Sequence, residues 1–239
     1  MWFIKRKSAD HAVKELMESL SNVLGGKLLS ILIYGSKASG EFHDDHSDVN
    51  VFMVLADVSE ETLKSLSVPL RTWMRNGHPL PVFIQKSELQ AYADSLPIEF
   101  LDMQEHHKVI FGSDVLSGLH VNRAHLRAQC QQELSIKLLK LRQAVLLADG
   151  HSKRLRELLT SSLPSVLTLY RAALRLESDI PKGGKIVAAQ EFSKRAGFDG
   201  DALARLWEVH MRRQTDNMQD LAQHYLVGLQ RALTYLHQK

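Results

Sequence analysis

Two apolar segments on either side of a short polar loop constrain the fold more than any other feature of this sequence. LLSILIY occupies residues 28–34 and VNVFMVL occupies residues 49–55. Runs of this kind are typical of β-strands that are covered on both faces. We therefore expect two buried strands joined through a polar loop at residues 36–47.

The remaining pattern up to residue 118 alternates between helix and strand. Helices are expected over residues 8–24 and 59–76 and from residue 87, and strands over residues 80–84 and 108–111. Ser8 and Ser59 can cap the first two helices. The glycine-containing pairs at residues 25–26 and 76–77 can end them. Residues 1–118 are therefore predicted to form an α+β (α/β) domain, a sheet with flanking helices.

Beyond residue 118 the pattern is helical. Helices are expected over residues 122–148, 152–177 and 186–196, with a last pair between residues 200 and 237. Apolar residues recur at helical spacing in the first of them: Leu126, Cys130, Leu134, Leu138, Leu141 and Val145. Residues 119–239 are predicted to form an all-α helical bundle domain. The apolar face of the first helix could form a homodimer surface or could be buried within the bundle, and the pattern leaves both open.

Composition narrows the class of protein and of partner. Apolar residues make up 44% of the chain and charged residues 24%, as in soluble globular proteins. The formal charge of +3 comes without a block of like charges, which permits a bound nucleotide and does not favour nucleic acid. A single cysteine fits a reducing compartment, and no apolar run reaches the ~20 residues of a membrane helix. The N-terminal residues do not read as a secretory signal, so we expect a cytoplasmic protein with no membrane contact.

The end of the first strand carries groups suited to binding phosphate. Gly35 has no side chain, so a phosphate could approach the backbone N–H groups there. The Ser36 hydroxyl and a following helix start would be further donors, and Lys37 would add a positive charge for a triphosphate. We expect a phosphate-binding loop here, and the alternative is a plain turn at the end of a strand.

The second strand begins with a polar pair. Alternate side chains share one face of a strand, so Asp48 and Asn50 are expected to point the same way, with Val49 and Val51 packed on the other face. Two polar side chains on one face of an apolar strand indicate a functional site. A carboxylate that only caps the preceding loop is the alternative reading of Asp48.

These residues together resemble a known signature. The arrangement Gly35-Ser36, Gly40 and then Ser47-Asp48-Val49-Asn50 is similar to that of the nucleotidyltransferase superfamily, which carries Gly-Ser followed by Asp-x-Asp or Asp-x-Glu. The kanamycin nucleotidyltransferase-like and minimal nucleotidyltransferase-like domains are the most similar in shape. The pair SDVNV and PIEFLDM also resembles a group of bacterial nucleotidyltransferase-like proteins. The resemblance implies a nucleotidyltransferase-fold mixed sheet followed by a helical C-terminal domain.

The resemblance also implies an activity and its residues. The activity is transfer of an NMP group from a nucleoside triphosphate to a hydroxyl of a small-molecule or protein acceptor, with Mg²⁺ held by strand carboxylates. Nucleotide binding would fall on Gly35, Ser36, Lys37 and Ser47. The first catalytic and metal-binding carboxylate would be Asp48.

This sequence departs from the signature at the second and third carboxylates. The second falls on Asn50, whose amide offers Mg²⁺ one neutral oxygen in place of a full negative charge. The third would lie within LPVFI at residues 80–84, which holds only apolar side chains. Both losses weaken the expected metal site.

Four other carboxylates could substitute for the missing ones. Asp44 and Asp45 lie in the loop just before Asp48, and Glu99 and Asp102 lie in PIEFLDM. Two functions therefore remain open. The chain is either an active nucleotidyltransferase or a catalytically silent module of the same fold that binds a nucleotide or a protein.

A weaker motif lies in the helical half. Arg205 and His210 match the Arg-x4-His pattern of helical ribonuclease-type toxins that often partner minimal nucleotidyltransferases. A chain with many Arg and His residues is expected to contain such a match by chance.

Overall fold

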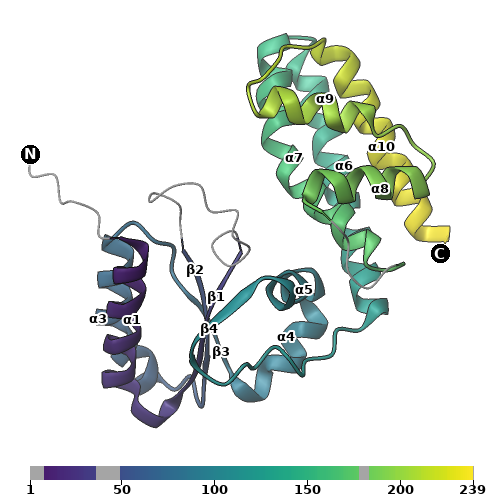
Figure 1. Cartoon of the computed structure of the whole chain (residues 1–239). Coiled ribbons are helices and arrows are strands. Elements are labelled where there is room, and N and C mark those ends of the chain that lie inside the picture. The colour runs from purple at the N-terminus through teal and green to yellow at the C-terminus, as the bar shows by residue number, and fades with distance from the viewer. Residues whose placement is uncertain (1–7, 36–48, 178–182, 239) are drawn as a thin grey trace, which may run out of the picture. The chain divides into compact units, whose positions relative to one another are not determined.

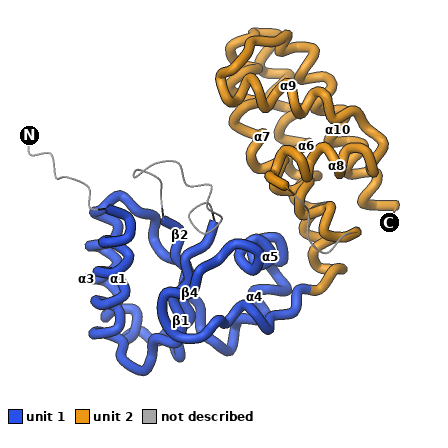
Figure 2. Tube along the Cα trace, in the orientation of Figure 1, with its two compact units in different colours: residues 1–121 blue, residues 122–239 orange. Residues whose placement is uncertain are grey.

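The structure, a computed structural model, describes residues 8–35, 49–177 and 183–238. It divides into two compact units, residues 1–121 and 122–239 (Figure 2). The division falls three residues beyond the boundary expected from the sequence. It coincides with the start of the first helix of the second unit, where the Asn122 side chain accepts the N–H of Ala124 at 2.8 Å.

The first unit is built around a four-stranded sheet (Figure 1). Its strands are β1 (Leu28–Tyr34), β2 (Asn50–Leu55), β3 (Val82–Gln85) and β4 (His107–Gly112), in the order β3-β2-β1-β4. β1 pairs antiparallel with both β2 and β4, whereas β2 and β3 are parallel. The sheet is therefore mixed, as the resemblance implied.

Helices cover both faces of this sheet (Figure 1). One face carries α1 (Ala9–Leu24) and α3 (Glu60–Arg75), and the other carries α4 (Leu89–Ser95) and α5 (Pro97–Glu105). From Val49 to Leu55, side chains alternate between two cores. Val49, Val51, Met53 and Leu55 pack with α1 and α3, whereas Phe52 and Val54 pack with α4 and α5. Both faces of β1 and β2 are thus buried, which explains their continuous apolar sequences.

Local sequence explains where most of these elements begin. The side chains of Ser8 and Ser59 accept N–H groups in the first turns of α1 and α3, which confirms the predicted caps. Short 3₁₀ turns follow α1 at Gly25–Lys27 and β3 at Lys86–Glu88. The predicted strand at residues 80–84 is found two residues later, at Val82–Gln85. Pro81 has no N–H to donate to a ladder, which accounts for the later start.

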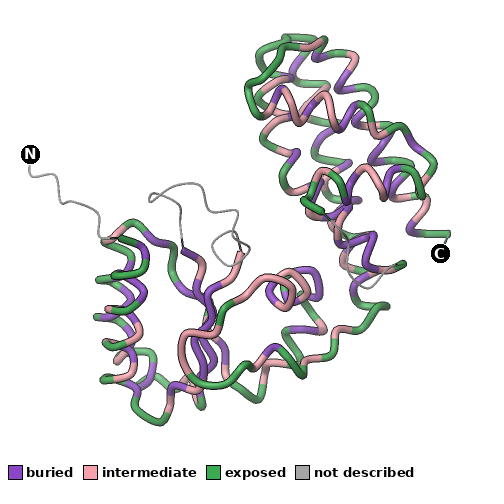
Figure 3. Tube along the Cα trace, in the orientation of Figure 1, coloured by how far each residue is buried: buried purple, intermediate pink, exposed green. Residues whose placement is uncertain are grey.

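The second unit contains five described helices. They are α6 (Arg123–Ala148), α7 (Ser152–Leu174), α8 (Lys185–Arg195), α9 (Asp201–His210) and α10 (Met218–Gln238). The apolar stripe predicted on α6, including Cys130, is buried within this unit as far as Leu141 (Figure 3). That stripe serves the internal core, and a homodimer remains a prediction. No helix in the described part of the chain is long and apolar enough to cross a membrane.

Candidate functional site

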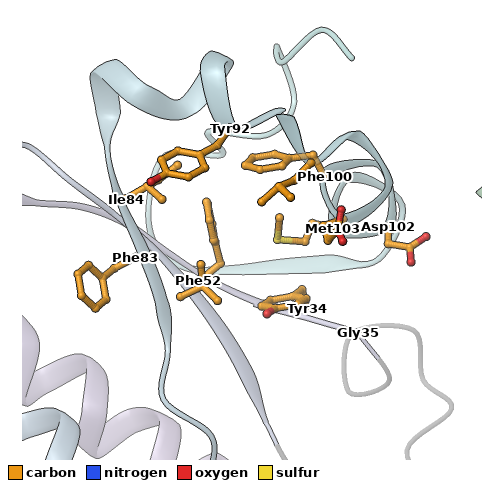
Figure 4. A pocket seen from close by; sticks show the side chains of 12 residues that line it. Tyr34, Gly35, Phe52, Phe83, Ile84, Tyr92, Phe100, Asp102 and Met103 are labelled. Carbon is orange, nitrogen blue, oxygen red and sulfur yellow. The ribbon is translucent and has the colours of Figure 1, made fainter. Parts of the chain in front are cut away.

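A cavity of about 440 Å³ lies against the face of the sheet that carries α4 and α5 (Figure 4). Its lining comes from β1, β2, β3, α4 and α5 and the residues that join them: Tyr34, Gly35, Phe52, Val82, Phe83, Ile84, Tyr92, Leu96, Glu99, Phe100, Asp102 and Met103. Most of these side chains are apolar or aromatic. A concave apolar site with a few polar groups is the usual form of a small-molecule site in proteins.

Gly35 ends β1 at one edge of this cavity. Its φ of 80° lies in the left-handed region, where glycine is favoured over every residue with a β-carbon. Its own N–H donates to the carbonyl of His106 at 3.3 Å. The N–H of Gly35 is therefore already used beside the β1–β4 pair. Phosphate binding at the backbone N–H groups that follow Gly35 stays a prediction.

Asn50 stands directly beside Gly35. It is the first residue of β2 and pairs across the sheet with Tyr34. Because side chains alternate along a strand, Asn50 shares the cavity face with Phe52, while Val49 and Val51 pack on the opposite face as predicted. Its side chain is half-buried. The predicted polar position on this strand is therefore at the cavity edge.

Most of the other predicted site residues lie between Gly35 and Val49 in the sequence. Ser36, Lys37, Ser47 and Asp48 lie outside the described residues, and so do the substitute carboxylates Asp44 and Asp45. Their roles stay predictions. Gly35 directly follows β1 and Val49 directly precedes β2, and these two strands are neighbours in the sheet.

β3 supplies no carboxylate to this site. It runs parallel to β2 with Val82 opposite Phe52, and its cavity-facing residues are Val82 and Ile84. Glu88, in the turn after β3, accepts the N–H of Gln85 at 3.2 Å and closes a capping box. The LPVFI segment, which has no acidic residue, therefore supplies most of the strand that pairs with β2.

Two of the substitute carboxylates do reach the cavity. Glu99 and Asp102 line it from α5, Glu99 exposed and Asp102 half-buried. They lie on one helix three residues apart, so one face of α5 presents both. The structure therefore brings this pair to the same cavity as Gly35, although not to the strand where the signature places its acids.

Tyr34 gives the cavity a neutral hydroxyl. Burial raises the pKa of Tyr34, so its phenol stays protonated at neutral pH. On β4, next to Tyr34, His107 is engaged in structure: Nδ1 lies 2.8 Å from the Met103 carbonyl and Nε2 lies 3.2 Å from Asp114. These contacts tie α5 and the loop after β4 to the sheet, so His107 has a structural role.

The described residues do not by themselves fit a magnesium site. No group of three or more His, Cys, Asp or Glu side chains in that part of the chain could hold a metal ion. Asn50 offers a neutral oxygen, β3 offers none, and the nearest carboxylates at the cavity come from α5. Mg²⁺ prefers anionic oxygens in octahedral geometry. Magnesium therefore remains a prediction that depends on Asp48.

Arg205 is not available for the toxin-like motif. Its guanidinium donates from Nε and Nη2 to the Asp216 carboxylate at 2.8 and 2.6 Å and from Nη2 to Asp220 at 3.0 Å. These hydrogen bonds raise the pKa of Arg205 and lower that of Asp216. The residue joins α9 to the start of α10, and we assign it a structural role.

Sequence reasoning missed the aromatic and apolar lining of the cavity. Phe52, Tyr92, Leu96 and Phe100 were not among the expected site residues, yet they surround the cavity with Met103 (Figure 4). Large apolar side chains of this kind look like ordinary core residues in a sequence.

Comparison with known proteins supports the fold. No protein-family profile matches the chain, and no curated protein is similar to it in sequence. Among solved structures, it is similar to spectinomycin adenyltransferase AAD(9) from Enterococcus faecialis, solved with ATP and spectinomycin. The two share 11% sequence identity and a TM-score of 0.57, over 95% of this chain and 99% of the other.

That likeness covers both units. The chain therefore has the nucleotidyltransferase fold, a mixed sheet with flanking helices, followed by a helical C-terminal region.

Proposed function

We propose that this protein binds a nucleoside triphosphate beside Gly35 and Asn50 and transfers the NMP group to a hydroxyl acceptor. The observation that carries the proposal is the position of Gly35. The glycine ends β1 at the edge of a cavity, next to Asn50, in a fold similar to that of an adenyltransferase. The resemblance of the Gly35-Ser36 loop to the nucleotidyltransferase signature supports the same function.

The proposed reaction needs a nucleophile, a leaving group and a proton acceptor. The acceptor oxygen attacks the α-phosphorus, and the bond from that phosphorus to the oxygen bridging the β-phosphorus breaks. Pyrophosphate leaves, and the hydroxyl proton passes to a carboxylate base. Glu99 and Asp102 are the described carboxylates at the cavity, and we assign the base role to this pair.

A second function has its own support. Asn50 replaces a carboxylate and β3 contributes none, so a magnesium site of full strength is not expected. The alternative is a catalytically silent module that binds a nucleotide and leaves it unchanged. Both functions require nucleotide binding at the same edge of the sheet, and they differ in the chemistry that follows.

Thermal unfolding tests the shared requirement first. The purified protein is heated with each of the four nucleoside triphosphates, in magnesium and in EDTA, beside the Asp48→Ala variant. A ligand at 100 times its dissociation constant adds about 2.7 kcal/mol to the stability of the native state. We expect a rise in the unfolding midpoint with at least one nucleotide and a smaller rise in the variant.

The pattern of the shifts then separates the two functions. A shift that needs magnesium and disappears in Asp48→Ala supports the transferase, and release of pyrophosphate on addition of acceptors is the next measurement. A shift that is equal in EDTA supports the silent module. If no nucleotide changes the midpoint, both functions are rejected.

A further inference from the structure

We infer that the cavity on the α4 and α5 face is the acceptor site, and that the acceptor is a small, largely apolar ring-containing alcohol without negative charge. The inference rests on the proposed function, because it names the substrate class of that site. It differs from a polar aminocyclitol such as the spectinomycin solved with the structural relative.

The size of the cavity fits a small organic molecule. A volume of about 440 Å³ lies within the roughly 300–1,000 Å³ range of sites for drug-sized ligands. The cavity is therefore large enough for a molecule of two or three rings. A purine base also has two fused rings, so volume alone does not separate it from such a molecule, and the ternary experiment described below does.

The floor of the cavity is a fixed aromatic surface. Phe52 and Phe100 are almost fully buried, and their rings meet edge to face with centroids 5.9 Å apart. Met103 and Ile84 are buried beside them (Figure 4). An edge-to-face pair in a packed core holds its geometry, so a ring placed on it is met by a preformed surface. Polar ligands would lose water here without gaining hydrogen bonds.

The rim of the cavity leaves large apolar side chains in solvent. Val82, Tyr92 and Leu96 are between 41% and 48% exposed although they line the cavity. Exposed apolar groups that gather around a concave surface mark binding sites more often than isolated ones do. A ligand that covers these three side chains gains the hydrophobic free energy of the buried area.

The charge of the lining excludes an anionic occupant. Glu99 and Asp102 contribute two carboxylates, and none of the described residues that line the cavity is Lys, Arg or His. A phosphate or carboxylate placed inside would exchange its hydration for a mostly apolar surface. The triphosphate is therefore not expected to enter, and the cavity is left to an uncharged or cationic molecule.

One end of the cavity lies at Gly35, beside the proposed position of the nucleotide. Gly35 lines it, and Asn50 lies against Gly35. A hydroxyl at this end of a bound ring would face the proposed phosphate position. The carboxylates of α5 line the same cavity, so a proton acceptor for that hydroxyl is already part of the site.

The test uses three probes, and binding is measured by calorimetry and not by activity. Two probes, 2-naphthalenemethanol and 2-naphthoate, share one ring system and differ in charge, and the third is spectinomycin. Each is added to the protein of 239 residues. We expect the neutral alcohol to bind about tenfold or more tightly than either of the others. Equal binding of the alcohol and the anion, or no binding of the alcohol, would overturn the inference.

Two variants connect binding to the cavity. Val82→Trp adds bulk at the rim and should weaken binding of the alcohol about tenfold. The matched control is Val68→Trp at a 68% exposed position on α3, where binding should not change. Glu99→Gln removes one negative charge from the cavity lining and should reduce the difference in affinity between 2-naphthalenemethanol and 2-naphthoate. Unchanged binding in both cavity variants would contradict the assignment.

A ternary experiment separates this inference from the proposed function. Calorimetry is repeated with the nucleotide that gives the largest thermal shift already bound. We expect the alcohol to bind the nucleotide complex, because acceptor and nucleotide occupy adjacent positions. Competition between them would place the base in the cavity and refute the acceptor assignment. Nucleotide binding without binding of the alcohol refutes only the inference. Binding of the alcohol without any nucleotide binding refutes the proposed function and, with it, the acceptor role of the cavity.

Discussion

A β-carbon at position 35 would lie 3.2 Å from Nδ2 of Asn50, so the glycine and the amide occupy adjoining space at the end of the β1–β2 pair. That separation is tighter than ordinary van der Waals contact. The two residues also come from the two halves of the proposed nucleotide signature. A substitution at either residue should therefore displace the side chain or backbone of the other.

The Gly35→Ala variant should lose both stability and nucleotide binding. The left-handed backbone at φ 80° costs a residue with a β-carbon roughly 1–2 kcal/mol, and the new methyl group presses on Asn50. Urea unfolding measures the first effect and calorimetry with the nucleotide measures the second. The control is Gly26→Ala, because a β-carbon at Gly26 meets nothing within 4 Å and the backbone is not left-handed. Equal stability of the two variants would contradict the assignment of strain to Gly35.

The Asn50→Asp variant should strengthen magnesium-dependent nucleotide binding. Two unit charges about 4 Å apart interact with an energy of about 4 kcal/mol at an effective dielectric constant of 20, so a new carboxylate at position 50 would attract a bound Mg²⁺ strongly. We expect the nucleotide affinity in magnesium to rise about tenfold or more, with little change in EDTA. Asn76→Asp, at the end of α3, adds the same charge away from the cavity and serves as the control. Loss of an existing activity in Asn50→Asp would instead mean that the natural amide belongs to a working site.

The sequence predicted the elements of the fold because their signals are local. The buried strands β1 and β2 are continuous apolar runs, and the α6 stripe recurs at helical spacing. Alternation along β2 also placed Asn50 on the face opposite Val51. Each of these inferences needs only neighbours within one element.

The parts that the sequence could not predict depend on contacts between distant residues. Gly35 gives its N–H to His106, which is 71 positions further along the chain, through the pairing of β1 with β4. The cavity likewise requires Phe100 of α5 to pack over Phe52 of β2. No local pattern distinguishes such a cavity lining from an ordinary core, since the same apolar residues form both.

Stability should fall at acid pH through Asp57, which anchors the start of α3. Ser59 and Thr62 donate side-chain hydrogen bonds to its carboxylate at 2.6 Å each, and these lower the pKa of Asp57. A depressed pKa in the native state stabilises the protein above the unfolded value of about 3.9, and that contribution is lost as the pH falls below it.

The Asp57→Asn variant tests this dependence. Its unfolding midpoint should lie below that of the natural protein at neutral pH, and the difference should shrink as the pH drops below about 4. Glu61→Gln removes one charge from the first turn of α3, which Asp57 precedes, and controls for net charge. A difference between Asp57→Asn and the natural protein that stays constant with pH would show that the hydrogen bonds to Asp57 do not govern the effect.

The Arg205→Lys variant should lower the stability of the helical unit without changing nucleotide binding. The guanidinium holds Asp216 through two parallel hydrogen bonds and reaches Asp220 as well, a geometry that a lysine ammonium cannot reproduce. Arg213→Lys is the matched control, because Arg213 meets Glu208 at 3.6 Å from an exposed position and makes a weaker pair. We expect the thermal midpoint to fall more in Arg205→Lys than in Arg213→Lys, with the nucleotide affinity of both unchanged. If Arg205→Lys kept its stability and lost a ribonuclease activity, Arg205 would be catalytic and our structural assignment would be wrong.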